Sequence, residues 1–381
     1  MASHAYLAAA ASERWISCPP SAKLCAQMED LGSPYAQEGT DAHSLCQYLL
    51  EQALGRHSRD PTDDLTFYNA EMQEAAEGYA AFVMEQLAEV KQHCPDPLVC
   101  VEQTVDFSKW VEHGFGTADA AIVADGMLYV TDMKYGLGVL VSAAGEDGCG
   151  NTQLKCYALG LLDTFGSLYD IRRIRLTIYQ PRRQNVDSYE LSTEELLYWA
   201  ENVLKPAAKL AYVGDGNFSA GTHCRFCKVR ATCRARAEYS MQLAKYDFED
   251  PPLLTEAEIA EILPRIDTLQ AWADDLRAYA LKQALAGTQY PGFKLVEGRS
   301  NRRYTSEEAV ARAVLEAGFD PYERKLLGIS AMTKQLGQKK FNEILKGLIE
   351  KPQGKPVLVP ESDRRPEYST ASSDFTEESS S

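Results

Sequence analysis

The chain has 381 residues, 45% of them hydrophobic, which is enough for one large domain with an appendage or for two modest domains. Its formal net charge of −16 at pH 7 argues against a protein that coats nucleic acid nonspecifically, because such binding depends on Lys and Arg neutralising phosphates. The chain lacks a long apolar run and its Ala-rich start lacks a basic region, so we expect a cytoplasmic protein without a membrane segment.

The N-terminal part of the sequence predicts helices. A short helix over residues 12–18 is expected to end at Cys18, because the two prolines that follow disfavour helical geometry before them. A second helix is expected to begin with Thr40 as its N-cap and to carry His43 in its first turn. A single His on a helix is more often a packed or solvated side chain than a metal ligand.

A long amphipathic helix is predicted over residues 71–93, and residues 98–107 then alternate as a strand. Residues 117–124 and 127–134 predict two further strands. Asp125-Gly126 between these strands is the strongest short signal for a β-hairpin. The centre of the chain is therefore expected to be a tight hairpin in a mixed sheet.

The predicted hairpin places Asp119 directly opposite Asp132, and Lys134 on the same face as Asp132. Two carboxylates opposed at about 5 Å destabilise a sheet unless something bridges them. A divalent cation is the natural bridge. The alternative interpretation is a solvated polar edge of a surface hairpin.

A glycine-rich segment over residues 135–151 follows the hairpin and is either a simple connector or a loop that contacts DNA or gates the site. The next helix carries Gln153 and Tyr157 on one face, because they are four positions apart. A strand over residues 171–180 and a helix over 193–212 come after it. Five arginines near that strand predict either a local DNA-contacting patch or a solvated face: Arg172, Arg173, Arg175, Arg182 and Arg183.

The ten cysteines suggest thiols or metal ligands rather than a disulfide scaffold. Cys224, Cys227 and Cys233 have the spacing of metal ligands, which is a much stronger signal than one Cys-x-x-Cys pair. Three sulfurs leave a four-coordinate site one ligand short, and a set of four cysteines suits both zinc and an iron–sulfur cluster. The candidates for the fourth ligand are Cys18, Cys25 and His223.

The composition changes after residue 240. We predict a core domain over residues 1–240, a mainly helical appendage over 241–350 and a tail over 351–381. The tail is rich in Ser, Glu and Pro, so it has too little apolar surface to order itself.

The order Gly116-x-x-Asp119, Asp132-x-Lys134 and Gln153-x-x-x-Tyr157 resembles three motifs of the RecB-like branch of the PD-(D/E)XK nuclease superfamily. The pattern Gly-Thr-x-x-His43 resembles a fourth motif of that branch. The resemblance is closest to a phage- and prophage-encoded group and covers most of the chain. It implies an α/β fold of the restriction-endonuclease type, in which helices flank a mixed sheet.

The resemblance also implies a metal-dependent DNA exonuclease of phage recombination or repair, with DNA as substrate and a single-strand annealing protein as partner. The carboxylates of Asp119 and Asp132 would hold Mg²⁺ or Mn²⁺ together with His43 and the main-chain carbonyl of Met133. Lys134 would orient the attacking water or neutralise developing charge. Gln153 and Tyr157 would position that lysine or the phosphate.

Iron–sulfur nucleases of the CRISPR-adaptation and AddB types pair one N-terminal cysteine with three near the end of the nuclease core. By this resemblance Cys18 joins Cys224, Cys227 and Cys233 around a [4Fe-4S] cluster that acts as a structural clip, with structural zinc as the alternative.

Two other classes of function stay open, an inactive DNA-end-binding subunit and an interaction protein built on a zinc site. The intact Asp119, Asp132 and Lys134 favour the enzyme. The sequence leaves open strand polarity, single- or double-strand preference, exonuclease or endonuclease action and oligomeric state.

Overall fold

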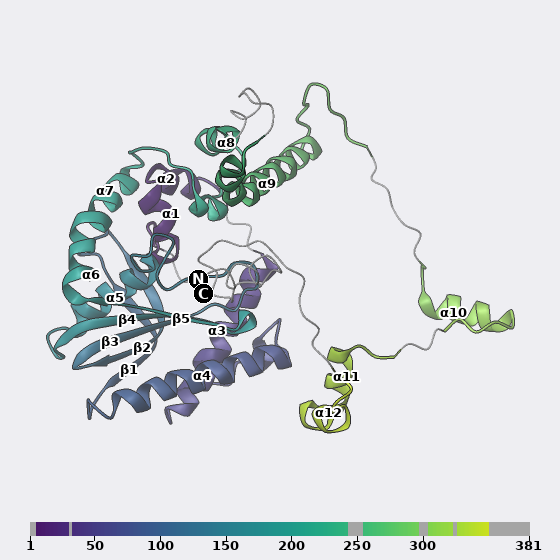
Figure 1. Ribbon diagram of the computed structural model, residues 1–381, viewed down its shortest axis with the longest axis horizontal. Helices are drawn as coiled ribbons and strands as arrows, with labels where there is room; N and C mark the ends of the chain where they lie inside the picture. The colour runs from purple at the N-terminus through teal and green to yellow at the C-terminus, as the bar shows by residue number, and fades with distance from the viewer. Residues whose placement is uncertain (1–4, 30–32, 243–253, 297–303, 323–325, 350–381) are drawn as a thin grey trace, which may run out of the picture. The chain divides into compact units, whose positions relative to one another are not determined.

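The computed structural model describes residues 5–29, 33–242, 254–296, 304–322 and 326–349 (Figure 1). The chain divides into two compact units, Met1–Gln283 and Ala284–Ser381. The first unit holds the sheet and its flanking helices, whereas the composition of the sequence suggested a boundary at residue 240. The predicted tail, residues 351–381, lies outside the described residues.

Five strands of the first unit form one sheet in the order β1-β2-β3-β4-β5. Neighbouring strands are antiparallel except β3 and β4, which are parallel and are connected through helix α5. A parallel pair needs such a crossover connection. Because the sheet contains both antiparallel pairs and one parallel pair, it is mixed, as predicted. The strands are β1 (Leu98–Asp106), β2 (Phe115–Ala124), β3 (Gly126–Met133), β4 (Ile171–Gln180) and β5 (Asn185–Ser192).

Helices cover both faces of the sheet (Figure 1). On one face lie α3 (Pro34–Ala53) and α4 (Ala70–Val90). On the other face lie α5 (Thr152–Phe165), α6 (Thr193–Trp199) and α7 (Lys205–Val213), with five π-helical residues at Ala200–Leu204. The remaining helices of this unit are α1 (Ser12–Ser17), α2 (Pro20–Ala26), α8 (Arg234–Met241) and α9 (Glu256–Leu285), with 3₁₀ turns at Ala9–Ala11, Thr62–Asp64, Pro181–Arg183 and Thr222–Phe226.

The alternation of side chains along the strands produces two apolar cores. In β2, Ala121 and Val123 pack with α5, whereas Ala120 and Ile122 pack with α3 and α4. Successive residues of a strand point to opposite faces, so a strand buried on both sides reads as a continuous apolar run. A mixed α/β architecture with helices on both faces of the sheet is therefore the fold of this unit.

The predicted hairpin is confirmed. Ala120 pairs with Thr131 and Ala124 with Met127, which is the register that a turn at Asp125-Gly126 requires. Gly126 has a φ of +86°, a conformation that costs glycine little.

The predicted start of α3 is wrong. The helix begins at Pro34 rather than at Thr40, because the Ser33 hydroxyl accepts a hydrogen bond from the N–H of Ala36 and caps it. The Thr40 hydroxyl instead donates to the carbonyl of Ala36 inside the helix. His43 consequently lies in the middle of α3 and not in its first turn.

Helix α9 is joined to α8 by charged side chains. The Asp275 carboxylate accepts hydrogen bonds from Arg230 at 2.8 Å and from Arg236 at 2.6 Å, and Arg236 is buried. Arg265 of α9 donates to the carbonyl of Tyr239 at 3.1 Å. These contacts hold α9 against the segment that carries the three C-terminal cysteines.

We expect Asp275→Ala to destabilise the protein by about 3 kcal/mol, because it leaves the buried Arg236 guanidinium without its carboxylate. The matched control is Asp274→Ala, whose ion pair with Arg277 is exposed and should contribute less than about 1 kcal/mol. Urea unfolding of both variants measures the difference. Equal stability of the two variants would contradict the inferred docking of α9.

The second unit contains three helices among its described residues, α10 (Glu307–Glu316), α11 (Ile329–Leu336) and α12 (Gln338–Ile344). The Ser306 side chain caps α10 by accepting from the N–H of Ala309. In the described parts of both units, no helix is both long and apolar enough to cross a membrane.

Candidate active site

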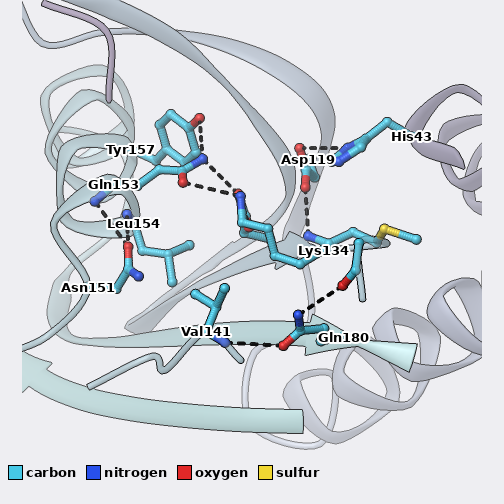
Figure 2. Close-up of polar contacts among 12 residues, drawn as sticks. His43, Asp119, Lys134, Val141, Asn151, Gln153, Leu154, Tyr157 and Gln180 are labelled. Atoms are coloured by element: carbon cyan, nitrogen blue, oxygen red, sulfur yellow. Dashed lines mark hydrogen bonds and ion pairs between the residues drawn. The ribbon is translucent and has the colours of Figure 1, made fainter. Parts of the chain in front are cut away.

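Polar side chains from α3, α5, β2 and the end of β3 meet where β2 and β3 leave the hairpin ladder (Figure 2). The predicted residues Asp119, Asp132, Lys134, Gln153 and Tyr157 are all in this group, and His43 joins them from α3. The structure therefore brings together residues that are far apart in the sequence.

Lys134 and Asp132 form an ion pair on the face that α5 covers. The Lys134 Nζ atom lies 2.8 Å from Asp132 Oδ2 and donates to Gln153 Oε1 at 3.2 Å. The Gln153 amide donates in turn to Asp132 Oδ1 at 3.0 Å and to the Tyr157 hydroxyl at 2.9 Å. Asp132 is only 2% exposed, and these contacts hold its carboxylate in one orientation.

The glycine of the Gly116-x-x-Asp119 motif makes room for this network. A Cβ atom at Gly116 would lie 2.7 Å from Cε1 of Tyr157, which is closer than real contacts allow. The ring of Tyr157 therefore packs directly on the main chain of β2. Its hydroxyl reaches Gln153 from that position.

Asp119 lies between His43 and the main chain of β3. One carboxylate oxygen is 3.3 Å from His43 Nδ1, and the other accepts a hydrogen bond of 2.7 Å from the N–H of Met133 (Figure 2). Met133 contributes this N–H to the site, and its side chain is buried in the core with α3 and α4. A role for its carbonyl oxygen stays a prediction.

Glu102 of β1 is a site residue that the sequence analysis did not identify. Its Oε1 atom lies 4.0 Å from His43 Nδ1. The ligand atoms of His43, Glu102 and Asp119 all lie within 4.8 Å of one another. Two carboxylates and one imidazole form a donor set that suits Mn²⁺ or Mg²⁺, so these three residues fit a single divalent cation. A charged residue directly after the apolar run Leu98-Val99-Cys100-Val101 was the available signal.

The strands are irregular where Glu102 and Asp119 face each other. Ala118 packs with α5 and Ala120 with α3 and α4, although residues two apart in a regular strand point to the same face. Glu102 has a φ of +45°, and its pairing with Asp119 is missing from the ladder. Such a conformation costs a non-glycine residue about 1–3 kcal/mol and is typical of functional sites.

The three carboxyl groups of the site differ in the direction in which their pKa values are shifted. Burial raises the pKa of Asp132, and the neighbouring Asp119 adds to that effect. Burial also raises the pKa of Asp119, but the charges of His43 and Lys134 outweigh it and lower the pKa below the ordinary value. Burial and the Asp119 carboxylate raise the pKa of Glu102 to about 7. Without a cation, the cluster therefore carries less negative charge than three free carboxylates would.

His43 should make the metal-free protein less stable at high pH. Burial lowers the pKa of His43, but the Asp119 carboxylate outweighs it and raises the pKa from 6.5 to about 9. The folded state thus binds this proton more tightly, and the stabilisation is complete below pH 6.5 and is lost as the pH rises through 9.

Thermal unfolding of the wild type and of His43→Gln in a chelator, from about pH 6 to 10, measures this effect. The difference in Tm between them should shrink as the pH rises. A difference that stays constant or grows would contradict the inferred protonation of His43.

The glycine-rich loop is fastened beside the site. The buried Gln180 donates to the carbonyl of Val139 at 2.6 Å and accepts from the N–H of Val141 (Figure 2). Asp187 accepts from the Ser142 hydroxyl, and Lys155 donates to the carbonyl of Cys149. These contacts at both ends of the loop argue against a freely moving gate.

The five arginines around β4 are engaged within the protein. Arg172 pairs with Asp170, and Arg173 and Arg175 pair with Glu190. Arg182 pairs with Glu38 and Glu71, and Arg183 donates to the carbonyl of Leu137. These contacts favour the interpretation of a structural or solvated face over an open phosphate-binding patch.

The four cysteines predicted as ligands surround one small cavity. Cys18 follows α1, Cys224 lies in the 3₁₀ turn Thr222–Phe226, and Cys233 caps α8. All three line the cavity together with Cys227.

The spacing of these sulfurs bears on the kind of metal. Sulfurs that share one zinc ion lie about 3.8 Å apart, given the usual Zn–S bond. Across the described part of the chain, His43, Glu102 and Asp119 form the only group of three such ligands within 4.8 Å. No three of the four cysteine sulfurs lie as close together as that group does in the described part of the chain, and the cavity is open to either zinc or an iron–sulfur cluster.

Residues 4–366 match the family model described as "Protein of unknown function (DUF2800)". The match covers nearly the whole chain, including both the hairpin site and the cysteine cavity.

Proposed function

Since the chain belongs to the DUF2800 family, whose description assigns no function, we propose its activity from the geometry of its site. The protein is a metal-dependent DNA nuclease of PD-(D/E)XK type that hydrolyses phosphodiester bonds, and it acts as an exonuclease in phage DNA recombination or repair.

One observation carries this proposal. The Asp132–Lys134 ion pair lies next to the group formed by His43, Asp119 and Glu102. Nucleases need a cation site and a positioned positive charge at one place, because phosphodiester hydrolysis develops negative charge on the phosphate. A purely structural hairpin has no need of two carboxylates at one end with a third from β1 beside them.

The residues that would hold the cation are His43, Asp119 and Glu102, with Asp132 beside them. A bound Mg²⁺ or Mn²⁺ supplies Lewis-acid stabilisation of the charge that develops on the scissile phosphate. The imidazole of His43 favours Mn²⁺ over Mg²⁺, because nitrogen is a softer ligand than oxygen.

The protein side chains supply the remaining chemistry. Lys134 keeps its proton, since burial lowers its pKa but Asp132 and Asp119 raise it more. Its ammonium group therefore orients the attacking water or neutralises charge on the phosphate. Gln153 holds both partners of the ion pair, and Tyr157 holds Gln153, so the lysine is positioned before the substrate arrives.

The cysteine cavity would hold a [4Fe-4S] cluster bound by Cys18, Cys224, Cys227 and Cys233. Ligation of cysteines from both ends of the first unit closes a loop of about 200 residues, so the cluster acts as a structural clip. A single structural zinc is the alternative.

End-labelled linear DNA and closed circular DNA, each incubated with Mn²⁺ and with a chelator, test the function. We expect metal-dependent release of label from linear DNA and no cutting of the circle. Cutting of the circle would replace the exonuclease with an endonuclease. Binding of DNA ends without any cleavage would favour the inactive end-binding protein and overturn the enzymatic proposal.

A further inference from the structure

Two cysteines from distant parts of the chain touch beside the cysteine cavity. The Sγ atoms of Cys25, in α2, and Cys227 lie 3.7 Å apart, although the residues are 202 positions apart in the sequence. The N–H of Lys228 also donates a hydrogen bond of 3.3 Å to the Cys25 sulfur. Both thiols are buried. Tertiary packing, and not closeness in sequence, therefore holds this pair together.

Cys25 differs from the four proposed ligands. It does not line the cavity that Cys18, Cys224, Cys227 and Cys233 surround, so it contacts one of them from outside. The sulfurs of a disulfide lie about 2.0 Å apart, which means that the Cys25 and Cys227 sulfurs need to approach by about 1.7 Å.

We propose that Cys25 and Cys227 form a disulfide when the cavity holds no cluster, and that this disulfide blocks cluster loading by removing Cys227 as a ligand. The disulfide rests on the geometry of the pair alone. The block on loading rests on the cluster proposed above.

A small disulfide such as glutathione disulfide is a sufficient oxidant. One protein thiolate attacks a sulfur of glutathione disulfide, which forms a mixed disulfide and releases one glutathione thiolate. The second protein thiolate then attacks the protein sulfur of the mixed disulfide and releases the other glutathione. The protein loses two electrons and two protons, and glutathione disulfide becomes two glutathione molecules.

The test uses the full-length protein, freed of metal by a chelator under reducing conditions and then treated with glutathione disulfide. After alkylation and trypsin digestion, the tryptic peptide 226–228, which holds Cys227, should be linked to peptide 24–56, which holds Cys25. Peptide 24–56 also contains Cys46. The link should therefore survive in Cys46→Ser and disappear in Cys25→Ser.

Two results would overturn the disulfide. One is a link between peptide 226–228 and peptide 15–23, which holds Cys18. The other is recovery of Cys227 as the free, alkylated thiol after oxidation.

Reconstitution with iron and sulfide tests the block on loading. The oxidised wild type should take up no iron while the link between the two peptides persists, and should take it up once sulfide or an added thiol has reduced that link, whereas Cys25→Ser treated in the same way should take up iron at once. Iron uptake by wild type that still carries the link would overturn the block. A link in protein that binds no iron even when reduced would leave the disulfide standing and refute the cluster. Iron binding by protein that forms no link would support the cluster and refute the disulfide.

Discussion

Asp132→Asn should abolish metal-dependent cleavage of linear DNA, lowering the rate by at least about 100-fold. The substitution keeps the shape of the side chain and the oxygen that accepts from Gln153. It removes the negative charge that pairs with Lys134 and acts beside Asp119. Lys134→Ala and Asp119→Ala should give the same loss. Initial rates of label release, with circular dichroism to confirm the fold, measure the effect.

The matched control is Asp125→Asn, at the opposite end of the same hairpin. The Asp125 carboxylate accepts a hydrogen bond from the N–H of Asp170, and an Asn oxygen can still accept it. Cleavage by this variant should equal that of the wild type. Wild-type cleavage by Asp132→Asn would end the assignment of the site.

Glu102→Gln separates the cation site from the ion pair. If Glu102 helps to hold the cation with His43 and Asp119, the Mn²⁺ concentration that gives half the maximal cleavage rate should rise by at least about tenfold in the variant. Its rate should recover at high Mn²⁺, whereas that of Asp132→Asn should not. An unchanged Mn²⁺ requirement would show that Glu102 is not a ligand.

The hairpin and its catalytic candidates could be predicted because local chemistry determines them. The turn at Asp125-Gly126 sets the register of β2 and β3, and the observed pairs extend to Ala120 and Thr131, one pair short of the predicted pairing of Asp119 with Asp132. Helical periodicity then places Gln153 and Tyr157 on one face of α5. No contact between distant segments is needed for either step.

Glu102 and Asp275 could not be placed in the same way. Glu102 joins the site through an irregularity shared by two strands and a positive φ, which alternation along a single strand does not reveal. Asp275 lies in a part of α9 whose sequence is rich in charged residues and gives no sign of burial. Only its contacts with Arg230 and Arg236 show that α9 packs against the segment around Cys233. The start of α3 was missed for a local reason, because Ser33 and Thr40 are both good N-caps and the proline after Ser33 decided between them.

Cys224→Ser should lose the iron of the anaerobically purified protein and destabilise its fold. If four thiolates hold a [4Fe-4S] cluster, the wild type should be brown, absorb broadly at about 400 nm and contain about four irons per chain. Cys18→Ser and Cys227→Ser should lose iron to the same degree, because each ligand belongs to the same clip between α1 and α8. Iron analysis and thermal unfolding of each variant measure the two effects together.

Cys25→Ser and Cys149→Ser are the controls, and they differ in what they exclude. Cys149 is exposed and lies away from the cavity, so its loss tests for nonspecific effects of losing a thiol. Cys25 touches Cys227 without lining the cavity, so Cys25→Ser should retain its iron. Loss of iron from Cys25→Ser together with full retention in Cys18→Ser would make Cys25 the fourth ligand. One zinc per chain and no colour in the wild type would instead replace the cluster with a single zinc ion.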